Sequence, residues 1–252
     1  MALLDFLDKD RRAARKVDTA IKKLTNPYRQ SEDRMQAAEH LAAVGAGGGE
    51  AAEAAIYGLL KRFTIRASNQ VVDEDEKAQV YALVVDLGQA AVPSLRRFIQ
   101  REDQLRHPLR ALAEIEPRDA VVRHVGEALA AVGPDYVKNP ESKLHLVQHL
   151  AELRHDLAPS YLTPFVADHD ESVRFQVVQA LARFPGAAAR DALMARLAGE
   201  EEETLRTIVA LCQSLADVDP EAVVPEDRRD AVRAILPDGW CLDEEGRLKK
   251  AG

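Results

Sequence analysis

An all-α solenoid of stacked helix pairs is the fold that this 252-residue sequence predicts, on two observations. The first is a recurring four-residue phrase, Leu-Ala-x-hydrophobic. With a degenerate copy at 84–87 included, successive copies begin 43, 28, 38, 31 and 34 positions apart. Repeats at periods of roughly 20–50 residues are typical of solenoids and propellers. The second is composition: aromatic residues make up 5% of the chain, and Ala and Leu are abundant, which favours helices over strands. The full copies lie at 41–44, 112–115, 150–153, 181–184 and 215–218.

Each copy of the phrase closes one expected helix and precedes a second. The first helices of the pairs are expected at 31–44, 73–87, 102–116, 140–154, 168–183 and 200–217. The second helices are expected at 50–66, 89–101, 117–131, 156–166, 187–198 and 221–235. The glycine run at 45–49, Gly88 and the Pro-Gly pair at 185–186 supply helix ends, and Pro117 suits the first turn of a second helix. Because one pair cannot bury its own apolar face, stacked pairs would share a core lined by the phrases.

The two ends of the array are expected to be covered by other segments. Residues 1–28 are interpreted as an N-terminal capping helix with Val17, Ile21 and Leu24 on one side, residues 29–236 as the repeat array, and 237–252 as a tail with a short hairpin. An apolar cluster begins the chain and precedes several cations. Packing of this cluster on the first repeat is favoured over docking on a membrane surface or a partner. The cluster consists of Leu3, Leu4, Phe6 and Leu7.

A family resemblance is carried by a few of these segments. Residues 170–174, Asp-Glu-Ser-Val-Arg, with Val177 and Leu181 after them, resemble the first helix of a HEAT repeat, in which an Asp caps the start and a Val-Arg pair follows. Residues 88–95 resemble the HEAT turn and second helix. The resemblance is to HEAT-like repeats of the PBS-lyase type in bacterial proteins and extends over about 31–235. It implies a right-handed α-α superhelix of about six helix pairs.

Composition limits the classes of function. The net charge of −8 argues against non-specific nucleic-acid binding as the main task, so nucleic acid is a disfavoured partner. No apolar run reaches the ~18–20 residues of a membrane span, and the start of the chain does not resemble a signal peptide. Cys212 and Cys241 show neither a disulfide framework nor zinc-ligand spacing. We therefore expect a cytoplasmic protein with no cofactor and no metal.

An extended array of helix pairs without a recognisable catalytic constellation predicts a non-catalytic scaffold or adaptor for another protein. The expected first helices are acidic in sum and the second helices slightly basic, and in HEAT-like arrays the second helices usually line the concave face. Arginine pairs well with carboxylates, so the partner is expected to present an acidic surface or peptide. The predicted partner-binding residues are Arg62, Arg66, Arg96, Arg97 and Arg101. The long segment 64–76 beside them is where a special site is first expected.

Several alternatives stay open beside the scaffold. The resemblance extends to bilin lyases and to alkylpurine DNA glycosylases, and an enzyme of either kind would need a deep pocket with a buried acid and an aromatic side chain. Glu141, His145 and His149 share one helix face, yet no further ligands are evident, so a polar stripe is favoured over a metal site. The glycine run at 45–49 is interpreted as a flexible turn, since Glu50 would repel an anion there.

Overall fold

The computed structural model describes residues 2–199 and 202–251, apart from the side chains of 2–11 and 50. Within this part the chain is built from α-helices and short 3-10 turns, with one two-stranded sheet near its end. The all-α fold predicted from the sequence is thus confirmed. The chain divides into two compact units, Met1–Val121 and Val122–Gly252, which are described separately.

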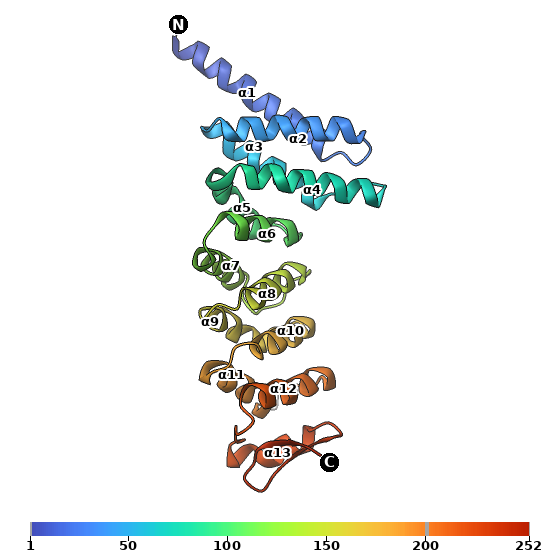
Figure 1. The fold of residues 1–252 in the computed structure, drawn as a ribbon, viewed down its shortest axis with the longest axis vertical. Helices are drawn as coiled ribbons and strands as arrows, with labels where there is room; N and C mark the ends of the chain where they lie inside the picture. Colours follow the sequence, from blue (N-terminus) through green and yellow to red (C-terminus); the bar gives the residue numbers. More distant parts are fainter. Residues whose placement is uncertain (1, 200–201, 252) are drawn as a thin grey trace. The chain divides into compact units, whose positions relative to one another are not determined.

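The first unit consists of a leading helix and helix pairs (Figure 1). Its elements are α1 (Ala2–Leu24), α2 (Ser31–Ala46), α3 (Glu50–Leu60), the 3-10 turn η1 (Lys61–Thr64), α4 (Gln70–Asp86), the 3-10 turn η2 (Gly88–Ala91), α5 (Val92–Ile99) and α6 (Arg106–Ile115). Helices α2, α4 and α6 are the first members of their pairs, and each packs against the next. Helix α7 (Arg118–Val132) follows α6 in the sequence and contains the boundary between the units.

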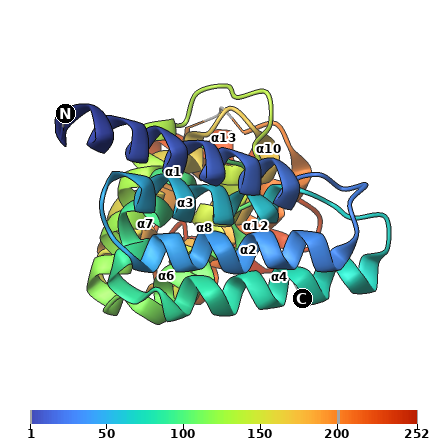
Figure 2. The ribbon, with the colours of Figure 1, turned by 90° about the horizontal axis from the view of Figure 1, so that it is seen from above.

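Helix α1 packs lengthwise on α2 and α3, as the end-on view in Figure 2 shows. Val17 and Leu24 of α1 are buried, and Ile21 between them is half-buried. Gly58 of α3 permits this approach, because a Cβ atom at that position would overlap the Ile21 side chain. The apolar cluster Leu3, Leu4, Phe6 and Leu7 lies outside the residues whose side chains are described.

The second unit continues the same pattern. Its elements are α8 (Glu141–Leu153), α9 (Ala158–Leu162), the 3-10 turn η3 (Thr163–Ala167), α10 (Glu171–Leu181), α11 (Ala187–Ala198), α12 (Leu205–Val218), the 3-10 turn η4 (Glu226–Arg228), α13 (Arg229–Ile235) and the strands β1 (Trp240–Leu242) and β2 (Leu248–Lys250). The first members α8, α10 and α12 form one layer, in which α10 packs between the other two (Figure 1). The strands pair antiparallel, with Leu242 opposite Leu248.

The leucines of the recurring phrase lie inside both units. The Leu residues that begin its full copies, at 41, 112, 150, 181 and 215, are at most 1% exposed. The predicted cap of α10 is also present, because the Asp170 side chain accepts hydrogen bonds from the amides of Ser172 and Val173 at 2.9 and 3.3 Å. Stacking therefore buries the leucines that the repeat pattern assigned to the core, whereas the final hydrophobic residues of the copies are half-buried at 44, 115, 153 and 218.

Buried ion pairs join successive helix pairs in the first unit. Glu76 of α4 accepts hydrogen bonds from Arg34 of α2 at 2.8 and 2.5 Å and from Arg62 of η1 at 2.9 Å. Asp73, one turn earlier, accepts from Arg62 and from Lys77 at 2.7 and 2.6 Å. Burial alone would raise the pKa of Asp73, but the hydrogen bonds from Lys77, the Ala67 amide and Arg62 lower it to about 2.

The second unit also joins successive helix pairs through buried carboxylates, which here lie just before a helix and not inside it. Glu202 accepts hydrogen bonds from Arg174 of α10 at 2.7 and 3.0 Å and from Arg196 of α11 at 2.8 Å. Asp168 accepts from Lys143 of α8 at 2.7 Å, and both side chains are fully buried. In both cases a cation in the first turn of one helix, Lys143 of α8 or Arg174 of α10, binds a carboxylate. That carboxylate lies just before the helix that begins the following pair. Asp168 and Glu202 had been expected inside helices, but these helices begin three to five residues later than predicted.

Candidate interaction surfaces

The first candidate surface lies on α3 and α5 in the first unit. Helix α5 is short, with Pro93 in its first turn, and it buries Leu95, Phe98 and Ile99 against the core. Its opposite face therefore presents Arg96 and Arg97 to solvent. Arg101 follows the end of the helix and is also exposed.

Tyr57 of α3 is the centre of this surface. The Arg97 guanidinium carbon lies 4.8 Å from the centroid of the tyrosine ring, and the Lys61 ammonium nitrogen lies 5.4 Å from it. Both distances are within the range of cation–π attraction. The Tyr57 hydroxyl donates a hydrogen bond to Glu102 at 2.8 Å, and Lys61 forms an ion pair with the same carboxylate. Burial, followed by this hydrogen bond, raises the pKa of Tyr57 to about 12 in spite of the nearby charges of Arg97 and Arg101.

The structure therefore brings part of the predicted arginine set together. The positive charges of Arg97 and Arg101 lie near Tyr57 and oppose the rise in its pKa. Arg96 is exposed on α5, next to Arg97. Arg66 is exposed in the segment between η1 and α4. We call Tyr57, Lys61, Arg96, Arg97 and Arg101 the basic surface.

Arg62 does not belong to this surface, which corrects the prediction for that residue. Its side chain is 0% exposed and donates to Glu76, Asp73 and the Ile65 carbonyl. The sequence pattern predicts one α-helix over 50–66, but the chain changes to a 3-10 turn at Lys61. A 3-10 turn has three residues per turn instead of 3.6, so the side chains rotate to other directions and Arg62 turns inward.

The segment 64–76 is where a special site was first expected. Its buried residues have a structural role instead. Asp73 and Glu76 are 5% and 1% exposed and are held by Arg62, Arg34 and Lys77. The acidic run after the loop therefore contributes two of its members to the core ion network.

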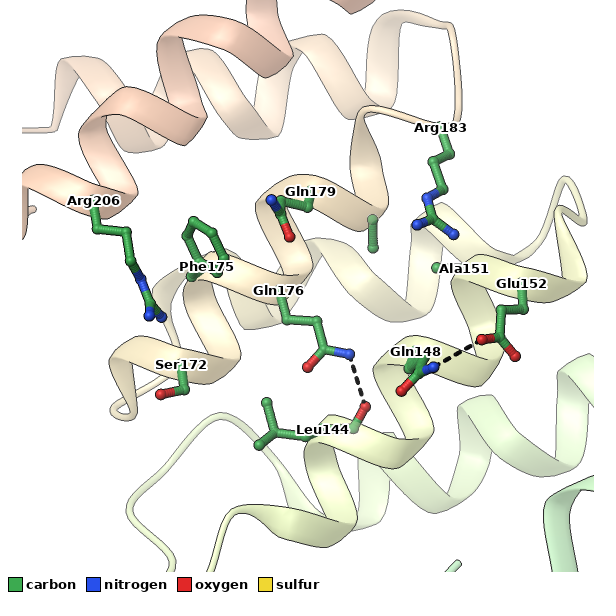
Figure 3. A pocket seen from close by; sticks show the side chains of 11 residues that line it. Leu144, Gln148, Ala151, Glu152, Ser172, Phe175, Gln176, Gln179, Arg183 and Arg206 are labelled. Atoms are coloured by element: carbon green, nitrogen blue, oxygen red, sulfur yellow. Dashed lines mark hydrogen bonds between the residues drawn. The ribbon is translucent and has the colours of Figure 1, made fainter. Parts of the chain in front are cut away.

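The second candidate surface is a cavity of about 420 Å³ on the layer of first helices in the second unit (Figure 3). Side chains from α8, α10 and α12 surround it. Most are polar, and their apolar centre is the ring of Phe175. The lining consists of Leu144, Gln148, Ala151, Glu152, Ser172, Phe175, Gln176, Gln179, Ala180, Arg183 and Arg206.

Hydrogen bonds and ring contacts fix some of the side chains that line the cavity, whereas others make no such contact. Arg206 lies 4.1 Å from the Phe175 ring centroid and donates two hydrogen bonds to Glu171, at 3.1 and 3.0 Å. Gln176 donates to the Leu144 carbonyl at 3.2 Å and so links α10 to α8. Arg183 extends from the end of α10 toward α8 (Figure 3), and its guanidinium has no hydrogen-bond or ion-pair partner among the described residues.

This cavity does not have the composition that the enzyme alternatives require. Its aromatic ring, Phe175, is half-buried, but its carboxylate, Glu152, is 53% exposed. An exposed carboxylate that accepts a hydrogen bond from Gln148 at 2.8 Å is not the buried acid that those alternatives predict.

The metal-site alternative concerns His149 together with Glu141 and His145. His149 is largely buried, and its Nε2 atom has no hydrogen-bond partner, while burial lowers its pKa. Among the described residues no group of three or more potential ligand side chains is arranged to hold a metal ion.

Helix pairs that stack through a shared core and ionic links define an α-helical repeat protein. Comparison with known families gives the kind of repeat: the family described as HEAT repeats matches residues 137–216. The segment 137–216 accordingly resembles HEAT repeats, and the match spans the helices around the second candidate surface. The PBS-lyase subtype stays a prediction. No curated protein matches the chain. None of the described helices combines the length and the apolar character needed to cross a bilayer.

The residues around the second surface were not predicted from the sequence as a site. A signal for them exists, because a glutamine stands two positions before the Leu of the phrase in three successive repeats, at 148, 179 and 213. Tyr57 was likewise missed, since a single tyrosine in a helical run gives no pattern.

Proposed function

We propose that this protein is a non-catalytic binding module that holds an acidic segment of another protein on the basic surface. HEAT repeats are commonly protein-interaction scaffolds, which supports the general role. The observation that carries the specific assignment is the exposed arginine group of α5 beside the ring of Tyr57. Tyrosine and arginine are the residue types enriched where protein interfaces gain most of their binding energy.

The internal partners of the basic surface can be exchanged for those of a ligand. Arg97 pairs with Glu53 at 3.5 Å, and the two side chains are 45% and 56% exposed. An exposed ion pair of this kind contributes about 0–1 kcal/mol. A carboxylate of a partner that binds Arg97 in a desolvated interface would therefore replace it at little cost.

Charge reversal tests this assignment. The full chain is used to capture proteins from a native lysate, and each captured partner is then titrated against the wild type and the Arg96→Glu/Arg97→Glu variant at low salt. We expect binding to weaken at least about tenfold, because two favourable charge contacts become repulsive. The thermal transition should shift only slightly, since both side chains are exposed and a surface ion pair such as Arg97–Glu53 contributes at most about 1 kcal/mol.

A matched control is Arg233→Glu in α13, which removes an exposed arginine paired with Asp230 at 2.8 Å. This variant should bind like the wild type. If every captured partner binds the double variant as tightly as the wild type, the basic surface is not the binding site.

A further inference from the structure

The exposed faces of α8, α10 and α12 carry the same residue types in matching rows. One row is apolar and consists of Leu144, Phe175 and Val209. A second row, one turn later on each helix, consists of the amides Gln148, Gln179 and Gln213, and all three are exposed. Because α10 packs against both α8 and α12, each row runs across three neighbouring helices. We call the two rows together the glutamine face.

The amide row keeps hydrogen-bonding capacity for a ligand. Gln148 and Gln213 each donate one hydrogen bond to a carboxylate one turn ahead, Glu152 and Asp217, at 2.8 and 2.9 Å. A glutamine amide has two N–H donors and an oxygen acceptor, so one donor and the oxygen are left on each. The corresponding position on α10 is Arg183, and Gln179 makes no side-chain hydrogen bond within the described residues.

The apolar row is more exposed than packing within the unit requires. Val209 is 41% exposed, and Leu205, one turn before it on α12, is 62% exposed. Phe175 is half-buried at the centre of the cavity, with Arg206 on its ring. Large apolar side chains grouped beside a cavity are typical of binding surfaces.

The distance between neighbouring glutamines along the amide row favours one backbone conformation of a bound peptide. Packed helices lie about 8–10 Å apart. A polyproline II chain rises about 3.1 Å per residue with three residues per turn, so every third residue returns to the same face after about 9 Å. A β-strand repeats its face after two residues, or about 6.7 Å, which does not match the helix spacing. A peptide in the polyproline II conformation would thus place one of its turns opposite each glutamine.

The charge of Arg183, beside the glutamine row, favours an acidic residue in the ligand sequence. Arg183 lies at the cavity, one turn after Gln179 and beside Ala151 of α8 (Figure 3), with its guanidinium unpaired among the described residues. A carboxylate is the group that a planar guanidinium binds best, through two parallel hydrogen bonds. The ligand that fits is an extended segment with an acidic residue opposite Arg183 and apolar residues over Phe175 and Val209.

We propose that the glutamine face binds an extended peptide segment of a partner protein, whose main chain is held by Gln148, Gln179 and Gln213 and whose acidic side chain pairs with Arg183. This site belongs to the second unit and does not depend on the basic surface. It recognises the main chain of the ligand in addition to one acidic side chain, whereas the basic surface recognises charge.

The test uses the full chain and a displayed library of random twelve-residue peptides. Enriched peptides are synthesised with a fluorescent label, and their affinities are measured by anisotropy. We expect Gln179→Ala to weaken binding about three- to tenfold, the loss of one or two hydrogen bonds. Arg183→Glu should weaken it at least about tenfold. The matched control is Gln79→Ala, an exposed glutamine on α4 that should leave affinity unchanged.

A backbone scan separates main-chain recognition from side-chain recognition. Each amide of the best peptide is N-methylated in turn, which removes the N–H that a glutamine oxygen accepts. We expect sensitivity at every third residue. Equal affinity of the Gln148→Ala/Gln179→Ala/Gln213→Ala variant, a flat methylation profile, or failure to enrich any peptide would overturn the proposal.

Two further results would assign the face differently. If the enriched peptides lose affinity for Arg96→Glu/Arg97→Glu but not for Arg183→Glu, they occupy the basic surface, and this proposal fails while the proposed function stands. If light scattering shows a dimer of the wild type that Phe175→Ala or Leu205→Asp dissociates, a second copy of the chain occupies the face, and the peptide assignment is wrong.

Discussion

Glu76 accepts hydrogen bonds from both Arg34 and Arg62, and these three side chains are at most 3% exposed. Removing the carboxylate would leave two buried guanidinium groups without their central acceptor. Loss of one member of a buried ion pair costs about 3–5 kcal/mol. We therefore expect Glu76→Ala to lower the free energy of unfolding of the first unit by that amount in urea titrations. Asp33→Ala removes the exposed pair with Arg29 and should change it by less than about 1 kcal/mol.

The same carboxylates make stability depend on pH. Burial opposes ionisation of Glu202, but hydrogen bonds from Arg174, Arg196 and the Thr204 amide lower its pKa from 4.5 to about 2. A carboxyl group whose folded pKa is lowered stabilises the fold above its unfolded pKa and loses that contribution as pH falls toward the folded value. The free energy of unfolding should thus fall between about pH 5 and pH 2, and less steeply in Glu202→Gln. Equal slopes for wild type and variant would contradict this assignment.

At the scale of elements, α1 reaches α3 because position 58 has no side chain. A Cβ atom there would overlap Cγ1 and Cδ1 of Ile21. Overpacking of this kind costs about 1–3 kcal/mol. We expect Gly58→Ala to lower the thermal midpoint and to speed proteolysis within α1. Adding Ile21→Ala should restore part of the loss by removing the overlapping atoms. If the double variant is destabilised by the sum of the single effects, the two helices do not meet at this point.

The helix pairs were predictable from sequence because the recurring phrase reports burial directly. The ends of the helices were not, since Arg62 and Phe165 lie in 3-10 turns that share the apolar pattern of an α-helix. Burial of a charged residue depends on partners such as Glu76 that are distant in sequence. The two candidate sites also differ in how far the sequence alone predicts them. The exposure of Arg96 and Arg97 follows from the apolar face of α5, whereas the cavity beside Phe175 requires three helices to be brought together.

For the whole molecule, division into two units predicts that damage to one leaves the other folded. In helical repeats each pair gains stability from its neighbours alone, so the effect of a substitution declines along the array. The single tryptophan, Trp240, lies in β1 of the second unit and reports on that unit by its fluorescence. In Glu76→Ala we expect the urea transition seen by circular dichroism to split into two steps, while the Trp240 transition stays in place. Glu202→Ala, in the second unit, should move the Trp240 transition to lower urea. A Trp240 transition that shifts equally in both variants would show that the chain unfolds as one cooperative body.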